Sequence, residues 1–150
     1  MRYVDVAEMS DLLELSARYW ACADGDPSER IGDLFTADAT FQLGSLSLAG
    51  REAIERFFSD RESAHRASAR TTRHVACNHR IIAREDDRVV LCSTVLVYAG
   101  VGALPLESTV PSGIADFRDD CIKSGPGGWR FARRAGSSIF VGPAAAAFAR

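Results

Sequence analysis

Long apolar runs, closely spaced cysteines and an excess of positive charge are all missing from this chain of 150 residues. No stretch approaches the roughly 20 apolar residues of a membrane-spanning helix, and residues 1–5 lead into polar positions without a signal-peptide core. We therefore expect a cytoplasmic protein with no membrane partner. The formal net charge of -2 excludes the basic excess that binding to a nucleic acid backbone requires.

Cysteine usage also excludes two kinds of stabilisation. None of the four cysteines forms a Cys-x-x-Cys pair, which disfavours a zinc site, and the missing secretory signal disfavours a disulfide framework. We predict no metal, and small buried thiols at Cys22, Cys77, Cys92 and Cys121. With 47% apolar and 25% charged residues, the chain has the composition of one compact domain over residues 1–150.

The N-terminal half has helical periodicity. Apolar residues recur at steps of three and four over residues 5–23 and again over residues 50–65, with a short helix predicted between them at 28–35. In the first helix, Leu13, Trp20 and Asp24 are predicted to share one stripe. This stripe places the Asp24 carboxylate at the core-facing end of the helix, where it needs a partner to offset desolvation.

The rest of the chain is rich in β-prone residues. Short strands are predicted at 39–43 and 46–48, and long ones at 71–84, 88–99, 107–123 and 129–141. Helices followed by such a meander indicate an α+β domain with the helices packed on one face of a mostly antiparallel sheet. Strands of this length bend, so we expect a curved sheet that encloses a cone-shaped cavity.

His74 and Asp24 are the candidate catalytic pair. A carboxylate that holds one nitrogen of an imidazole increases the basicity of the other, which makes a general base that needs no cofactor. Strand alternation puts His74 and Asn78 on one face, where the Asn78 amide could bind a substrate oxygen, unless a β-bulge breaks the parity. Structural roles remain open: Asp24 as a turn former, and His74 as a buried core histidine.

Several motifs, in this order and spacing, resemble the SnoaL-like branch of the nuclear transport factor 2-like superfamily. They are the helix ending in Asp24, Phe35-x-x-Asp38-Ala39, Gly50-Arg51-Glu52-Ala53-Ile54, Arg73-His74-x-x-x-Asn78 and Trp129-Arg130-Phe131. The resemblance implies a curved sheet around a cone-shaped pocket, and a homodimer or homotrimer. In the scytalone dehydratase-like and dehydrochlorinase-like members, an Asp/His pair removes a proton from carbon while a neighbouring group leaves, and Asp24 and His74 match that pair.

The chain also departs from both of these members. It has Tyr19 at the position of a dehydrochlorinase lysine, Ala23 in place of a dehydratase tyrosine, and no second histidine on the strand over residues 89–96. The dehydrochlorinase also carries an arginine on the penultimate strand near the position of Asp119, where this chain has only the adjacent Arg118. The machinery that assists the leaving group in either enzyme is therefore not reproduced, and neither substrate is transferred.

The predicted function is a cofactor-independent lyase of the dehydratase type, or an isomerase, acting on a small apolar cyclic or polyketide-like molecule. His74 is the predicted base and Asp24 orients it, while Asn78 and Tyr19 bind the oxygen of the substrate. The predicted pocket wall includes Trp20, Phe41 and Phe57.

Two alternatives remain open. One is a non-catalytic protein, either a scaffold resembling the β subunit of a ring-hydroxylating dioxygenase or a small-ligand carrier. The other resembles ketosteroid isomerase and would use Asp116 as its base. The charged positions 84–88 and 133–134 are expected in solvent, and the tail from Pro143 could cover the pocket mouth or a neighbouring subunit.

Overall fold

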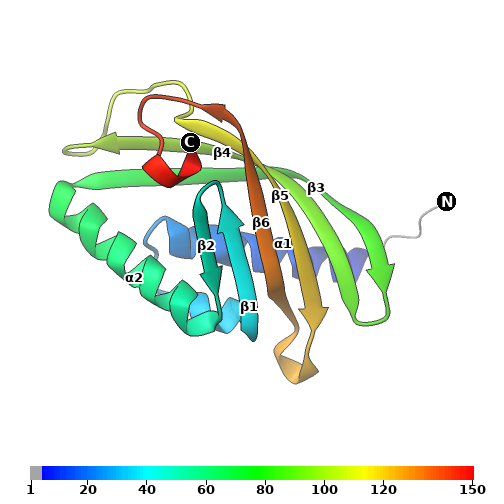
Figure 1. The fold of residues 1–150 in the computed structure, drawn as a ribbon. Coiled ribbons are helices and arrows are strands. Elements are labelled where there is room, and N and C mark those ends of the chain that lie inside the picture. The colour runs from blue at the N-terminus through cyan, green and yellow to red at the C-terminus, as the bar shows by residue number, and fades with distance from the viewer. Residues whose placement is uncertain (1–4) are drawn as a thin grey trace.

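The structure is a computed structural model that describes residues 5–150 (Figure 1). Its elements in chain order are α1 (Val6–Ala23), a 3₁₀ turn (Ile31–Leu34), β1 (Phe35–Leu43), β2 (Leu46–Ala49), α2 (Arg51–Ser68), β3 (Arg70–Glu85), β4 (Arg88–Val101), β5 (Gly113–Lys123), β6 (Trp129–Val141) and a last 3₁₀ turn (Ala147–Ala149). None of the described helices is long and apolar enough to cross a membrane. Residues 1–4, which enter the prediction that no signal peptide is present, lie outside the described part.

The strands form one mixed sheet in the order β2-β1-β6-β5-β4-β3. Among the described strands, β1 and β6 pair in parallel and all other neighbours are antiparallel. The long strands bend around the helices (Figure 1), with α1 packed against β3 and β6, and α2 against β1, β2 and β3. The predicted α+β class, with helices on one face of a curved, mostly antiparallel sheet, is confirmed.

Helix α1 begins at an N-cap, where the Asp5 carboxylate accepts a hydrogen bond from the Ala7 amide at 3.0 Å. Its buried face consists of Leu12, Leu15, Ser16, Tyr19, Trp20 and Ala23. Leu13, predicted on the same stripe as Trp20, is instead 42% exposed, because the buried stripe passes through Leu12. The helix ends at Asp24, and Gly25 then leaves the helix with φ of 86°.

Several predicted boundaries are wrong, and the strand predicted at 39–43, for example, begins at Phe35. The helix predicted at 28–35 is only the turn Ile31–Leu34, because Phe35 pairs with Phe131 and already belongs to β1. The strand predicted at 107–123 begins at Gly113. Pro105 and Pro111 lie in the segment before it, and proline cannot donate to a strand ladder.

A β-bulge in β3 puts His74 and Asn78 on different faces of the strand, whereas strict alternation would put both on one face. The register with β4 shifts between Cys77 and Arg80, and Asn78 adopts φ of 56°, a left-handed conformation that asparagine tolerates better than most residues. Asn78 is exposed, whereas His79 turns inward and its Nε2 lies 2.9 Å from the Ser16 hydroxyl. The shared face predicted for His74 and Asn78 is therefore wrong.

Candidate active site

Asp24 and His74 meet at the junction of α1 and β3. The Nδ1 atom of His74 lies 2.6 Å from Asp24 Oδ1, and the His74 backbone amide donates to Asp24 Oδ2 at 2.9 Å. The Thr72 hydroxyl donates to Oδ1 at 2.9 Å. The helix end thus delivers a carboxylate whose two oxygens are held by three donors from one strand, which fixes the position of the imidazole.

The electrostatics of Asp24 favour its ionised form. Burial acts to raise the pKa of the carboxyl, but the hydrogen bonds from His74 and Thr72 and the charge of His74 outweigh burial, so the pKa lies below its ordinary value of 3.8. An ionised Asp24 accepts the Nδ1 proton of His74, which assigns the neutral imidazole the tautomer with an unprotonated Nε2. Within residues 5–150, no hydrogen bond engages Nε2.

Trp20 holds the other side of the imidazole. Its ring stacks on His74 with the planes 20° apart and the centroids 4.7 Å apart. The stacking therefore fixes the orientation of the ring.

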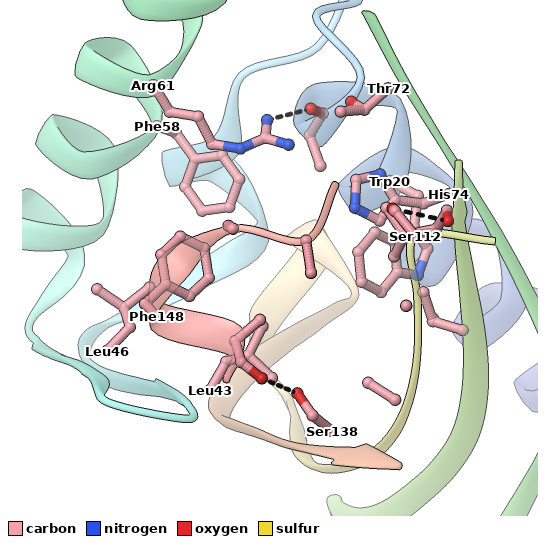
Figure 2. A pocket seen from close by; sticks show the side chains of 18 of the residues that line it. Trp20, Leu43, Leu46, Phe58, Arg61, Thr72, His74, Ser112, Ser138 and Phe148 are labelled. Atoms are coloured by element: carbon pink, nitrogen blue, oxygen red, sulfur yellow. Dashed lines mark hydrogen bonds between the residues drawn. The ribbon is translucent and has the colours of Figure 1, made fainter. Parts of the chain in front are cut away.

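His74 lines a cavity of about 510 Å³ that is bordered by the helices, the sheet and the C-terminal tail (Figure 2). This volume lies in the range of pockets that hold small organic ligands. The predicted residues Tyr19, Trp20, Phe41 and Phe57 all line it. Most of the wall is apolar, and its polar or charged members in the described chain are Asp60, Arg61, His65, Arg70, Thr72, His74, Ser112 and Ser138.

Two other candidates do not reach this cavity. Asn78 is exposed at the bulge and is not among the described lining residues. Asp116 is also exposed, accepts a hydrogen bond from the Thr94 hydroxyl at 2.8 Å and is absent from the described lining, which contradicts its nomination as a base.

Tyr19, by contrast, does line the cavity. Burial raises the pKa of the Tyr19 phenol, so Tyr19 stays neutral and able to donate a hydrogen bond.

A buried ion pair that packs on two cavity-lining rings was not predicted. Arg134, expected in solvent, is fully buried, and its Nε and Nη2 atoms donate to the two carboxylate oxygens of Asp119 at 2.9 and 3.1 Å. Its guanidinium carbon lies 3.9 Å from the centre of the Tyr19 ring and 5.0 Å from that of Trp20. The pair thus supports the ring that stacks on His74.

Comparison with known proteins identifies the family of this chain. Residues 4–135 match the model of the SnoaL-like domain. The chain belongs to the SnoaL-like family. No protein among the curated ones matches the chain.

Three solved structures illustrate the fold of this SnoaL-like protein. A hexachlorocyclohexane dehydrochlorinase, LinA type 2, is 15% identical with a TM-score of 0.72, over 90% of this chain and 87% of that one. A candidate scytalone dehydratase from Novosphingobium aromaticivorans is 18% identical with a TM-score of 0.71, over 94% and 96%. A nuclear transport factor 2-like protein with a cystatin-like fold, from the same species, is 21% identical with a TM-score of 0.71, over 95% and 87%.

The C-terminal tail, which follows the matched domain, lines the cavity of its own chain through residues 145, 146, 148 and 149. The Phe148 carbonyl accepts from the Ser45 amide at 3.0 Å, and the Ala149 carbonyl accepts from the Ser138 hydroxyl at 2.6 Å. The Phe148 ring packs edge-on against Phe57, with centroids 5.8 Å apart. The tail therefore forms part of the cavity wall.

Replacing Gly44 by alanine should displace this tail. The added Cβ would lie 1.9 Å from the Phe148 carbonyl oxygen, and Gly44 has φ of 56°. Loss of one or two tail hydrogen bonds, at about 0.5–1.5 kcal/mol each, should make a bound neutral naphthalene probe dissociate roughly 10-fold faster in stopped-flow dilution. The matched control is Gly125→Ala, which has a similar φ of 57° with nothing near its Cβ. Equal dissociation rates in the two variants would contradict a role of the tail in holding the probe.

The depressed pKa of Asp24 predicts a pH-dependent contribution to stability. Because the folded state holds Asp24 below its ordinary pKa of 3.8, the stabilisation is fully present above that pH and is lost as the pH falls through the lower folded value. The difference in unfolding free energy between wild type and Asp24→Asn should thus be flat near neutrality and shrink in acid. Urea titrations over a pH series measure it, and a difference that grows in acid would refute the assignment.

Proposed function

We propose that this protein is a lyase of the dehydratase type that eliminates water from a small cyclic β-hydroxy ketone, with His74 as the general base. The observation that carries the proposal is the His74 imidazole, held by Asp24 through Nδ1 at 2.6 Å and lining a largely apolar cavity through its other side. Proton abstraction from carbon needs such a positioned base in a site that excludes water.

The reaction balances with groups of the site and substrate alone. The Nε2 atom of His74 takes the proton from the carbon next to the ketone, and that electron pair forms the new carbon–carbon double bond. The hydroxyl on the adjacent carbon leaves with the proton from the imidazolium. Water and an enone result, and the imidazole returns to its neutral form.

Other groups at the site have supporting roles. Asp24 stabilises the imidazolium by a charge-assisted hydrogen bond, and the Trp20 ring covers its face. The neutral Tyr19 phenol is the proposed donor to the ketone oxygen, where negative charge develops as the proton leaves. Similarity to a dehydrochlorinase and to a candidate scytalone dehydratase supports elimination chemistry as the class of reaction.

The scaffold alternative would be favoured by an interior filled with Phe and Trp side chains. The interior instead holds a cavity of about 510 Å³ beside the Asp24–His74 pair, which favours a ligand. An isomerase would share the first step and return the proton to a different carbon. The predicted homodimer or homotrimer remains a proposal, which light scattering on the purified protein tests.

Two assays separate the steps. Loss of water from a β-hydroxytetralone gives a fluorescent naphthol, which reports the whole elimination. Deuterium exchange at the α-carbon of plain tetralone, followed by NMR in deuterium oxide, reports proton abstraction alone. Both reactions should be faster with the protein than with buffer. Binding of tetralone without exchange would refute the lyase and support the carrier.

A further inference from the structure

Arg61 lies at the boundary between two pockets of the protein. It lines the large apolar cavity, and it also lines a second recess of about 420 Å³, whose wall includes residues of α1, α2 and β3. Figure 2 shows its side chain extending from α2 toward Thr72, with one hydrogen bond drawn to the Ala23 carbonyl. A ligand in the apolar cavity can therefore present one end to this guanidinium.

The recess carries an excess of positive charge in a chain that is acidic overall. Four arginines line it, against the two carboxylates of Asp24 and Glu62. Asp24 is occupied by its three donors, and Glu62 pairs with Arg66 at 2.5 Å. The remaining arginines are Arg61, Arg70 and Arg73.

These three arginines bind backbone carbonyls rather than carboxylates. Arg61 donates to Ala23, Arg70 to Ala144 at 2.9 Å, and Arg73 to Thr72 at 2.7 Å. None of the three forms an ion pair with a carboxylate in the part of the chain that the structure describes. Arg61 Nε and Nη2 make no hydrogen bond to any residue in 5–150, although Arg61 is half-buried.

Arg61 and Arg70 differ from Arg73 in their position. Both line the large cavity as well as the recess, whereas Arg73 is exposed and lines only the recess. Asp60, the carboxylate of the described cavity lining, is exposed and forms no ion pair with Arg61. Within residues 5–150, the boundary between the cavity and the recess therefore offers two cations that form no ion pair with a carboxylate, although the charge of Asp24 acts on Arg61.

From this arrangement we infer that the ligand of the cavity is an acid: an apolar ring system that carries a carboxylate, which Arg61 binds with support from Arg70. The ring system lies among the aromatic side chains, and the carboxylate lies at the boundary between the two pockets. A planar guanidinium offers paired donors that match the two oxygens of a carboxylate. The Arg61 bond to Ala23 uses Nη1 and leaves the edge formed by Nε and Nη2 for the ligand.

The inference rests on the proposed function for its chemical meaning, since it defines the substrate class of the same site. It implies that the β-hydroxy ketone bears a carboxylate remote from the reacting carbons. Its test uses equilibrium binding and no turnover. A failure of the lyase assays and a failure of the acid preference are therefore separate results.

Calorimetric titration of the whole protein with naphthoate and with naphthamide tests the inference. The two probes share a ring system and nearly the same shape, and differ in charge. Because a hydrogen bond to a charged group contributes more than a neutral one, naphthoate should bind about 10- to 100-fold more tightly. Equal affinity, or tighter binding of naphthamide, would overturn the inference without any variant.

Variants then locate the carboxylate. Arg61→Gln should reduce the naphthoate preference to near unity and leave naphthamide binding within about twofold, while Arg70→Gln should reduce the preference partially. Arg56→Gln is the matched control, because Arg56 is an exposed arginine on the same helix outside both described linings. An Arg61→Gln protein that loses affinity for both probes equally would assign Arg61 only to capping the Ala23 carbonyl. A preference that survives in that variant would also overturn the inference.

Discussion

Replacing His74 by alanine should lower the rate of α-proton exchange in tetralone by about 10²- to 10⁴-fold, the usual contribution of a positioned general base. Of the two imidazoles that line the cavity, His74 is the one that a carboxylate holds and orients, and its replacement removes that positioned base. Because the His74 side chain borders an existing cavity, the variant should still fold. NMR in deuterium oxide measures the rate, and circular dichroism confirms the fold.

Asp24→Asn tests the same base through its partner. An asparagine at this position can present its NH₂ group to Nδ1 and so favour the tautomer that protonates Nε2, which is the wrong form for a base. We expect a loss of at least about tenfold in exchange. The control is His79→Ala, since His79 binds Ser16 and is not among the described residues of the cavity wall. If the His79 and His74 variants lose activity equally, the dyad is not the base.

The contact between Asp24 and His74 was predicted from a local pattern at each partner together with the family resemblance. Asp24 lies one residue beyond an 18-residue helix whose buried face ends at Ala23, so helical periodicity placed the carboxylate at the core-facing end. His74 lies near the start of β3, before its register changes. Strand alternation was therefore still valid at that position. The missed residues all depend on longer-range information.

Asn78 shows the limit of alternation. Nothing in the run from Cys77 to Arg80 marks a bulge except an asparagine that tolerates positive φ, and the bulge itself follows from the register of β3 against β4. The extra residue of the bulge turns Asn78 outward and His79 inward, the reverse of the predicted arrangement. Prediction from sequence fails at this point because strand pairing, and not composition, decides the parity.

Arg134 was missed for a related reason. The neighbouring Arg133 is exposed as predicted, and two adjacent arginines are typical of a solvated strand. Arg134 is buried because β6 pairs with β5 in the register that sets it opposite Asp119. A buried arginine cannot be predicted without its acidic partner, and that partner lies on another strand.

Removing that partner should cause the largest loss of stability. Asp119→Ala leaves the Arg134 guanidinium buried without a counter-charge, with its Nη1 atom already lacking a hydrogen-bond partner among residues 5–150. Breaking one side of a buried ion pair costs about 3–5 kcal/mol in unfolding free energy. The matched control is Asp120→Ala on the same strand, whose partner Arg88 is 53% exposed, so the expected loss is about 0–1 kcal/mol. Urea unfolding measures both variants, and equal losses would contradict the prediction.

A double variant separates the charge of this pair from its packing. Burial raises the pKa of Asp119 to about 6 against the attraction of Arg134, so keeping the pair ionised at neutral pH has a desolvation cost. Replacing both residues with apolar ones, as in Asp119→Leu with Arg134→Met, removes that cost together with the attraction, and the stability should return to within about 1–2 kcal/mol of wild type.

The same double variant tests whether Arg134 positions the base. The guanidinium that packs on Tyr19 and Trp20 would still be missing, and Trp20 stacks on the His74 ring. If the double variant is stable but exchanges tetralone protons more slowly, Arg134 acts as a positioning residue for the base. If the double variant recovers both its stability and its rate of tetralone proton exchange, the ion pair has no role in positioning the base.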